Sequence, residues 1–332
     1  MNIQKKVALA QYTTFKTGGM ADFFCEVKTE KELLEVFGWI KKNGLKYFVL
    51  GNGSNLLVSD LGFRGVAVKL TNGEVGWEEN ESVAGAGVLL PGLIAEAKKY
   101  GLGGMEWAFG IPATLGGAVR NNAGAFGSDM SKSVEAVKIF DCASLEFKAI
   151  KNKECNFSYH RSVFQDQSAW IIWEITLGWE KKDREVINEG IQNFLTQRKE
   201  RQPLESPSAG SFFRNPTLAH LEKSKREDMV NTFVKHELAK CTPDQDKFKV
   251  EQAIRARTEQ SNTLPAAYLI EATGLKGRSI GGAQVSEKHA NFIINTGSAT
   301  TEGVIILASM VKQKVRTKFG LQMHEEVEYA GF

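Results

Sequence analysis

The first part of the chain has the hydrophobic pattern of two strands with a helix between them. Residues 21–27 (ADFFCEV) and 47–50 (YFVL) form short apolar runs of the kind found in buried strands. Between them, apolar residues recur at helical spacing after Thr29 and Glu32, which stand in the arrangement of a capping box. Residues 21–50 are therefore predicted to form a β-α-β unit.

A glycine-rich loop follows the second of these strands, in the sequence LGNGSNLLV at residues 50–58. Its two glycines suit a dinucleotide fingerprint, but that fingerprint needs a third glycine and a following helix. Here the pattern continues as strand instead. Successive backbone N–H groups could still hold a phosphate, with Ser54 and Asn55 adding side-chain donors; a plain tight turn is the alternative.

A second glycine-rich segment lies at residues 101–127, after a predicted strand at 82–87 and a helix that begins at Pro91. The segment holds 8 of the chain's 32 glycines. Each ordered glycine costs roughly 0.5–1 kcal/mol relative to alanine. Large apolar residues are interleaved with these glycines, which does not fit a flexible linker. We therefore expect something to approach this backbone closely.

The remaining patterns predict a meander of antiparallel strands over residues 134–179 and a helix from about 184 to 199. Gln202 and Pro203 then indicate a domain boundary. Residues 217–264 contain 17 charged residues in 48 at helical spacing, which predicts solvent-exposed surface helices.

Composition and charge describe an ordinary globular protein. A length of 332 residues favours two or three domains, at about 150 residues per domain. The net charge of +3 gives no reason to expect a nucleic-acid or membrane partner. The four cysteines show no metal-ligand spacing, so we expect neither zinc nor a disulfide. Because no secretory signal or membrane span is apparent, we expect a cytoplasmic protein.

Five segments of the sequence occur together in one known family. They are YTTFKTGG at 12–19, LGNGSNLLV at 50–58, GIPATLGGAVRNNAGAFG at 110–127, PSAGSFFRNP at 207–216, and GLKGRSIGGAQVSEKHANFIINTGSAT at 274–300. In this order they resemble the flavin-dependent UDP-N-acetylenolpyruvoylglucosamine reductases of bacterial peptidoglycan precursor synthesis. The resemblance covers most of the chain, and although each segment is weak alone, five in register are specific.

The resemblance implies an α+β chain with the PCMH-type FAD-binding fold of the vanillyl-alcohol oxidase superfamily. In that fold FAD lies between a small β-α-β domain and a larger α+β domain, and a C-terminal α+β domain binds the substrate. The expected parts are 1–70 and 71–203 for FAD, 204–320 for the substrate, with the charged helical insertion at 217–264, and 321–332 as a C-terminal strand.

The family's pyrophosphate site uses backbone amides of inter-strand loops, which would explain why no helix follows the first glycine loop. By resemblance, the residues that bind FAD are Gly51, Asn52, Gly53, Ser54, Asn55, Gly110, Ile111, Pro112, Gly116, Gly117, Asn122 and Gly124. Ala113 stands where the family usually has glycine, a small change that keeps FAD binding expected.

The reaction implied by the resemblance has two halves. NADPH delivers a hydride to FAD, and the reduced flavin passes a hydride to C3 of the enolpyruvyl group on UDP-N-acetylglucosamine. A proton must then reach C2, and the negative charge that builds there needs nearby donors. The expected partner is thus a small nucleotide sugar, and we expect a monomer.

Two residues match the family's proton-transfer groups, namely Ser211 as the serine proton donor and Glu326 as the catalytic glutamate. A serine is a weak acid, so its role depends on a dry and well-positioned site; an ordinary turn serine is the alternative. The Glu-Val register selects Glu326. On a strand Glu326 and Glu328 would share one face, and Glu325 and Glu328 are expected to be solvated carboxylates.

The third catalytic residue of the family is an arginine in a Tyr-Arg-x-Ser pattern. Here Tyr159 is followed by His160, and the arginine is Arg161, which on a strand would face the other side. A bulge could bring Arg161 back, His160 could take its place, or the enzyme could be impaired. The guanidinium fork favours Arg161; if His160 serves, activity should fall as rising pH deprotonates the imidazole.

The candidate substrate contacts by motif position are Tyr159, His160, Arg214, Asn215, Lys288 and His289. Two other functions remain open. One is an FAD-dependent oxidase of small alcohols, which would consume oxygen without NADPH. The other is a catalytically impaired nucleotide-sugar sensor, motivated by the shifted arginine.

Overall fold

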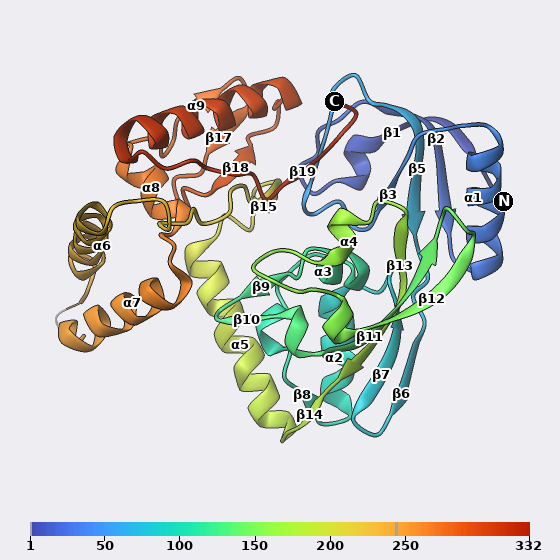
Figure 1. Ribbon diagram of the computed structural model, residues 1–332, viewed down its shortest axis with the longest axis horizontal. Helices are drawn as coiled ribbons and strands as arrows, with labels where there is room; N and C mark the ends of the chain where they lie inside the picture. The colour runs from blue at the N-terminus through green and yellow to red at the C-terminus, as the bar shows by residue number, and fades with distance from the viewer. Residues whose placement is uncertain (1, 243–244) are drawn as a thin grey trace. The chain divides into compact units, whose positions relative to one another are not determined.

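The computed structural model describes residues 2–242 and 245–332, which fold into two compact units (Figure 1). Unit 1 contains the chain up to Ala209 together with Glu328–Phe332, and unit 2 is Gly210–Val327. The predicted segments 1–70 and 71–203 therefore both lie in unit 1. Strands and helices occur in both units, which confirms the predicted α+β class.

The first sheet of unit 1 has the strand order β1-β2-β5-β3. Both β2 (Met20–Val27) and β3 (Tyr47–Leu50) run parallel to β5 (Phe63–Leu70), and β1 (Gln4–Ala8) is antiparallel to β2. Helix α1 (Glu30–Lys42) begins with the predicted capping box and connects β2 to β3. The β-α-β unit is confirmed, and its crossover leaves one strand position open, which β5 fills.

The second sheet of unit 1 is antiparallel, in the order β12-β11-β13-β7-β6. Its strands are β6 (Val75–Glu78), β7 (Glu81–Gly85), β11 (Val134–Asp141), β12 (Glu146–Lys151) and β13 (Trp170–Gly178). The predicted antiparallel strands are confirmed, but their meander order is wrong, because β13 pairs with β11 and not with β12. The other helices of unit 1 are α2 (Leu90–Lys99), α3 (Leu115–Arg120), α4 (Val163–Asp166) and α5 (Arg184–Arg201). Of these, α3 and α4 pack on β13.

Several short elements complete unit 1. The strand β4 (Leu56–Val58) pairs in parallel with β19 (Glu328–Ala330), the last strand of the chain. Two further short pairs are β8 (Leu102–Gly103) with β14 (Glu180–Lys181), and β9 (Gly124–Ala125) with β10 (Ser128–Asp129). Single 3-10 turns occur at Leu9–Tyr12, Glu106–Ala108, Met130–Lys132 and Asn152–Glu154.

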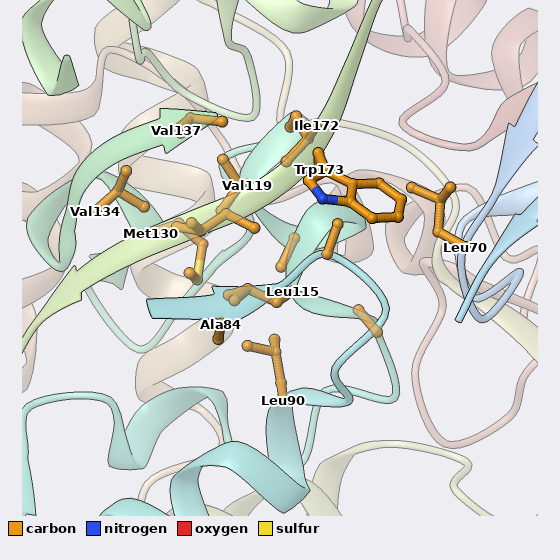
Figure 2. Close-up of a cluster of buried hydrophobic side chains, with 14 of the residues drawn as sticks. Leu70, Ala84, Leu90, Leu115, Val119, Met130, Val134, Val137, Ile172 and Trp173 are labelled. Atoms are coloured by element: carbon orange, nitrogen blue, oxygen red, sulfur yellow. The ribbon is translucent and has the colours of Figure 1, made fainter. Parts of the chain in front are cut away.

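One large hydrophobic cluster runs through unit 1 and joins its two sheets. Figure 2 shows part of it, where Ala84 of β7, Leu115 and Val119 of α3, and Trp173 of β13 lie together. In the same cluster, Phe37 of α1 contacts Phe140 of β11, with ring centres 5.5 Å apart. Because side chains of α3 are part of this core, the core fixes the backbone of the second glycine-rich segment, which contains α3.

Unit 2 is built on a sheet in the order β15-β18-β17-β16. Its strands are β15 (Ser208–Ser211), β16 (Ser279–Ile280), β17 (Ala283–Val285) and β18 (Phe292–Asn295). The long helix α9 (Thr301–Phe319) packs on β16 and β17, and α8 (Ala266–Ala272) contacts α9. The helix α9 ends at Gly320, whose φ of 72° suits a glycine cap.

The charged stretch 217–264 forms two helices that pack against each other, α6 (Lys223–Leu238) and α7 (Lys247–Ser261). A bridge between Thr217 and Thr263 closes the base of this insertion. Most of its side chains are exposed, as predicted. Its packing against α8 includes Phe233 and Tyr268, whose ring centres are 4.7 Å apart. Within residues 2–242 and 245–332, none of the helices is long and apolar enough to span a membrane.

Candidate functional site

The loop between β3 and β4, residues 51–55, lies directly against the second glycine-rich segment. The amide nitrogen Nδ2 of Asn52 donates a hydrogen bond to the carbonyl of Pro112 at 2.7 Å. A Cβ atom added to Gly51 would lie only 2.4 Å from the hydroxyl oxygen of Thr114. The structure thus brings together two segments that the sequence assigned to one cofactor.

The 51–55 loop presents a row of backbone donors. Among the described residues, the N–H groups of residues 51–54 donate to no acceptor. The carbonyls are used instead: Gly53 accepts from the N–H of Thr14 at 3.2 Å, and Asn55 accepts from the N–H of Glu328 at 3.0 Å. Because successive unpaired backbone donors make an anion-binding nest, this loop fits a pyrophosphate better than a plain turn.

The glycines of the second segment have different structural reasons. A Cβ atom on Gly116 would lie 2.7 Å from the Cβ of Ala86, and one on Gly124 would lie 2.9 Å from the carbonyl oxygen of Ser128. Packing within the chain therefore explains both. A Cβ atom on Gly117 would meet nothing closer than 3.4 Å, so the chain itself leaves room there. Gly117 is therefore a predicted cofactor residue beside which a ligand fits.

Two glycine substitutions are expected to separate folding from cofactor binding. Gly53→Ala should destabilise the cofactor-free protein by more than about 1–2 kcal/mol, because Gly53 has a φ of 63° and its Cβ would lie 2.2 Å from the carbonyl of Tyr12. Gly117→Ala should leave that stability unchanged or slightly higher, yet weaken FAD binding. Urea unfolding of the apoprotein and flavin fluorescence titration check the two effects. Equal flavin affinity in Gly117→Ala and wild type would contradict the second.

Asn122 holds the glycine-rich segment in place. It is buried, its side-chain oxygen accepts from the N–H of Ser131 at 3.0 Å, and its Nδ2 donates to the carbonyl of Ser158 at 2.9 Å. The amide thus ties this predicted cofactor residue to the turn that carries Tyr159, His160 and Arg161. A structural role is shown for Asn122, and contact with FAD stays a prediction.

The Tyr159-His160-Arg161 sequence lies on a tight turn, so the strand geometry assumed from the sequence is wrong here. Ser158 and Arg161 exchange backbone hydrogen bonds of 3.0 and 3.1 Å, and His160 adopts a φ of 50°. Alternation between two faces therefore does not apply. The guanidinium of Arg161 forms an exposed ion pair with Asp166 at 2.6 Å, and Tyr159 is 53% exposed.

Ser211 and Glu326 come from the two ends of unit 2 and are held by one set of backbone hydrogen bonds. The N–H of Glu326 donates to the carbonyl of Phe212 at 2.9 Å, and the N–H of Arg214 donates to the carbonyl of His324 at 2.9 Å. Ser211 is the residue directly before Phe212. The structure therefore gathers the serine and the glutamate that the sequence selected.

The C-terminal strand is shorter than predicted, and Glu326 does not belong to it. Strand β19 contains only Glu328–Ala330, and a bend at Val327 separates it from Glu326. The expectation that Glu326 and Glu328 share a strand face is therefore wrong. Glu325 forms an ion pair with Lys312 at 2.5 Å, and Glu328 forms one with Arg120 of α3. Glu325 and Glu328 are thus both paired with basic side chains.

Asn291 is a positioning residue that sequence reasoning missed. Its side chain accepts from the N–H of Phe213 at 3.0 Å and donates to the carbonyl of the same residue at 2.8 Å. Its own carbonyl accepts from the N–H of Phe212 at 2.7 Å, and only 5% of the residue is exposed. Asn291 thereby fixes the backbone that follows Ser211. The fifth segment contains it, but only the strand pairing shows what it holds.

The other predicted substrate residues have structural tasks of their own. Asn215 accepts from the N–H of Ala266 at 2.9 Å and so caps α8. Burial lowers the pKa of His289 to about 4, and its Nδ1 accepts from the N–H of Asn291 at 3.3 Å. His289 is therefore neutral at pH 7 and offers no charge to a diphosphate. Arg214 and Lys288 are placed by backbone bonds to His324 and to the hydroxyl of Ser286.

Comparison with known proteins supports the same grouping of segments. Residues 21–144 match the family model described as an FAD binding domain, and residues 202–330 match the C-terminal domain of UDP-N-acetylenolpyruvoylglucosamine reductase. A reductase of that name from Bacillus licheniformis is 37% identical over 97% of this chain and 92% of its own length. One from Caldanaerobacter subterraneus is 36% identical with the same coverage.

A solved structure extends the agreement to the fold. The crystal structure of the Thermus caldophilus UDP-N-acetylenolpyruvylglucosamine reductase matches with a TM-score of 0.72 and 30% identity, over 99% of both chains. Together with the matching FAD-binding domain, it confirms the predicted FAD-binding fold and an FAD-dependent oxidoreductase. This chain belongs to the family of UDP-N-acetylenolpyruvoylglucosamine reductases.

Proposed function

We propose that the protein reduces the enolpyruvyl group of UDP-N-acetylglucosamine enolpyruvate to give UDP-N-acetylmuramate, with NADPH as reductant and FAD as cofactor. This places it in peptidoglycan precursor synthesis. Its relatives carry the reductase name over nearly the whole chain. The structural observation that carries the proposal is the hydrogen bond between Glu326 and Phe212, which gathers the two predicted proton-transfer residues.

Two parts of unit 1 would hold FAD, the loop after β3 and the segment around Gly117. The N–H groups of residues 51–54, which donate to no described acceptor, suit the pyrophosphate, and the open space at Gly117 suits another part of FAD. What FAD supplies when bound is hydride transfer from NADPH to C3 of the substrate. The remaining tasks, which are proton delivery and recognition of the substrate carboxylate, fall to the side chains.

In this proposal the hydroxyl of Ser211 donates the proton that reaches C2. The Asn291 clamp on Phe213 and the bond from Glu326 to Phe212 fix the serine backbone from two directions. A fixed position is what a weakly acidic hydroxyl needs in order to act. Glu326 in its protonated form can donate to the substrate where negative charge develops.

Arg161 is the residue we propose for the substrate carboxylate. Its ion pair with Asp166 is solvent-exposed on both sides. Exposed pairs contribute only about 0–1 kcal/mol, so a substrate carboxylate can replace Asp166 at little cost. Among the described residues of the turn, Arg161 also offers the only guanidinium. In this proposal Arg161 takes the role of the family's arginine although it stands one position later in the sequence, and His160 does not need to carry a charge.

Substitutions at the turn are expected to distinguish Arg161 from His160. Arg161→Ala should lower kcat/KM for the enolpyruvyl substrate by about 10–100-fold, since a charge-assisted hydrogen bond contributes roughly 1.5–3 kcal/mol. The matched variant His160→Ala should retain most activity, and wild-type activity should stay flat between roughly pH 6 and 8. Steady-state kinetics across this range provide the measurement. An inactive His160→Ala with an active Arg161→Ala would reverse the assignment.

The function itself is tested on the purified protein. A yellow protein that oxidises NADPH only when the enolpyruvyl substrate is present supports the reductase. Oxygen consumption with small alcohols and no NADPH would instead support an oxidase, and substrate binding without turnover would support the impaired sensor. We further propose that the enzyme acts in the cytoplasm as a monomer, without a nucleic-acid or membrane partner.

A further inference from the structure

Arg198 of α5 is a buried cation that forms no ion pair within the described part of the chain. Only 6% of the residue is exposed. One guanidinium nitrogen, Nη2, donates to the carbonyl of Trp107 at 3.1 Å, and the guanidinium carbon lies 5.1 Å from the ring centre of Phe126. The nitrogen Nε is buried and has no acceptor among these residues. The chain thus surrounds this charge with a carbonyl and an aromatic face, and with no described carboxylate.

Such an arrangement is costly unless something else compensates the charge. Burial lowers the pKa of Arg198, which reports the penalty on its charged form. The indole N–H of Trp107 is a second buried donor without a described acceptor. Buried donors in native proteins almost always have partners. Among the described residues, the Arg198 guanidinium thus has no negative charge beside it, and Nε of Arg198 and the indole N–H of Trp107 have no acceptor.

The position of Arg198 indicates where those atoms come from. A Cβ atom on Gly110 would lie 2.5 Å from Cδ and 2.9 Å from Nε of Arg198, so glycine at 110 lets the arginine lie against the backbone. Two residues further on, Pro112 accepts the hydrogen bond from Asn52 of the 51–55 loop. Arg198 thus borders the same short stretch of backbone that meets the proposed pyrophosphate site.

The turn that carries Phe126 strengthens this connection. Phe126 lies between β9 and β10, and its ring centre is 4.8 Å from that of Phe194, one helical turn before Arg198 on α5. Through Trp107 and Phe126, the arginine contacts residues on both sides of the stretch from Gly110 to Gly124, which contains the predicted cofactor residues. A ligand bound along this stretch would lie near two donors without a described acceptor, Nε of Arg198 and the indole N–H of Trp107.

We propose that Arg198 is a cofactor-binding residue whose missing counter-charge is supplied by bound FAD. The negative charge is either that of the pyrophosphate, which is present in both redox states, or that of the reduced isoalloxazine ring. This inference rests on FAD being the cofactor of the proposed function. It adds a charged side chain from α5 to a site otherwise made of backbone amides and glycines.

The test compares two substitutions that differ in charge. Arg198→Lys keeps a cation, and Arg198→Gln keeps a donor for the Trp107 carbonyl but removes the charge. The exposed Arg201→Gln, on the same helix, is the matched control. For each protein, flavin is removed and rebound, and the FAD dissociation constant, the thermal midpoint of the apoprotein and the midpoint potential of the bound flavin are measured.

If the pyrophosphate supplies the charge, Arg198→Gln should bind oxidised FAD at least about tenfold more weakly than Arg198→Lys. If the reduced ring supplies it, oxidised FAD should bind equally while the midpoint potential of Arg198→Gln falls by about 30 mV, the equivalent of a tenfold change. In either case, the apoprotein of Arg198→Gln should be at least as stable as that of Arg198→Lys, since a buried unpaired charge has gone.

Equal affinities and equal potentials in the two variants would overturn the proposal, whatever their stability. If the wild-type protein is yellow and reduces the substrate, equal values in the two variants would still leave the proposed function intact. A wild-type protein that binds no flavin would instead overturn the proposed function together with this inference. Arg201→Gln should match wild type in every readout.

Discussion

Replacing Ser211 with alanine is expected to lower kcat for reduction of the enolpyruvyl substrate by about 10²–10⁴-fold, the range for loss of a positioned general acid. Reduction of the flavin by NADPH should proceed at the wild-type rate, because that half-reaction needs no proton at C2. The side chain removed is small and the Asn291 clamp on the following residues remains. The loss should therefore be chemical and leave folding unaffected.

Anaerobic stopped-flow measurements follow the two halves separately, first flavin bleaching by NADPH and then reoxidation by the substrate. Ser208→Ala is the matched control, because it removes a hydroxyl from the other end of the same short strand, β15. It should retain both half-reactions. A slow NADPH step in Ser211→Ala, or normal reoxidation, would show that Ser211 is not the proton donor.

Glu326→Gln is expected to have the second large effect, again about 10²–10⁴-fold on the substrate half-reaction. Glutamine keeps the size and the backbone bond to Phe212, but it cannot be protonated to donate as a carboxylic acid. Substrate binding should be affected much less, because the change mainly removes an interaction made during the reaction. The measurement is the reoxidation rate at saturating substrate.

Glu325→Gln provides the comparison for Glu326. It breaks the ion pair with Lys312, which is partly exposed, so it should cost no more than about 1 kcal/mol of stability. Activity should remain near wild type, and urea unfolding together with the same kinetic measurement checks both expectations. If Glu325→Gln lost more activity than Glu326→Gln, the choice based on the Glu-Val register would be wrong.

Local features were predictable because they depend on neighbours in the sequence. The capping box at Thr29 and Glu32 and the strands on either side of α1 follow from hydrogen bonds and side-chain spacing within a few residues. The same holds for the helix beginning near Pro91. The absent helix after the 51–55 loop was also visible in the pattern, and it correctly excluded a dinucleotide fold of the usual kind.

Predictions failed where they assumed a regular strand that the backbone does not form. The alternation argument for His160 and Arg161 failed because a turn with a left-handed residue occupies that segment. The prediction that Glu326 and Glu328 share a strand face failed because the chain bends at Val327, between them. In both places, hydrogen bonds to distant or opposing residues outweigh the local strand preference.

The sequence by itself determined the order of the motifs, the chemistry of their side chains and the local elements that carry them. The tertiary structure decided which of them meet: Asn52 with Pro112, Glu326 with Phe212, Asn291 with Phe213, and Arg198 with Trp107. These contacts join residues far apart in the chain. Their formation depends on strand register and on the shared core, which no local pattern specifies.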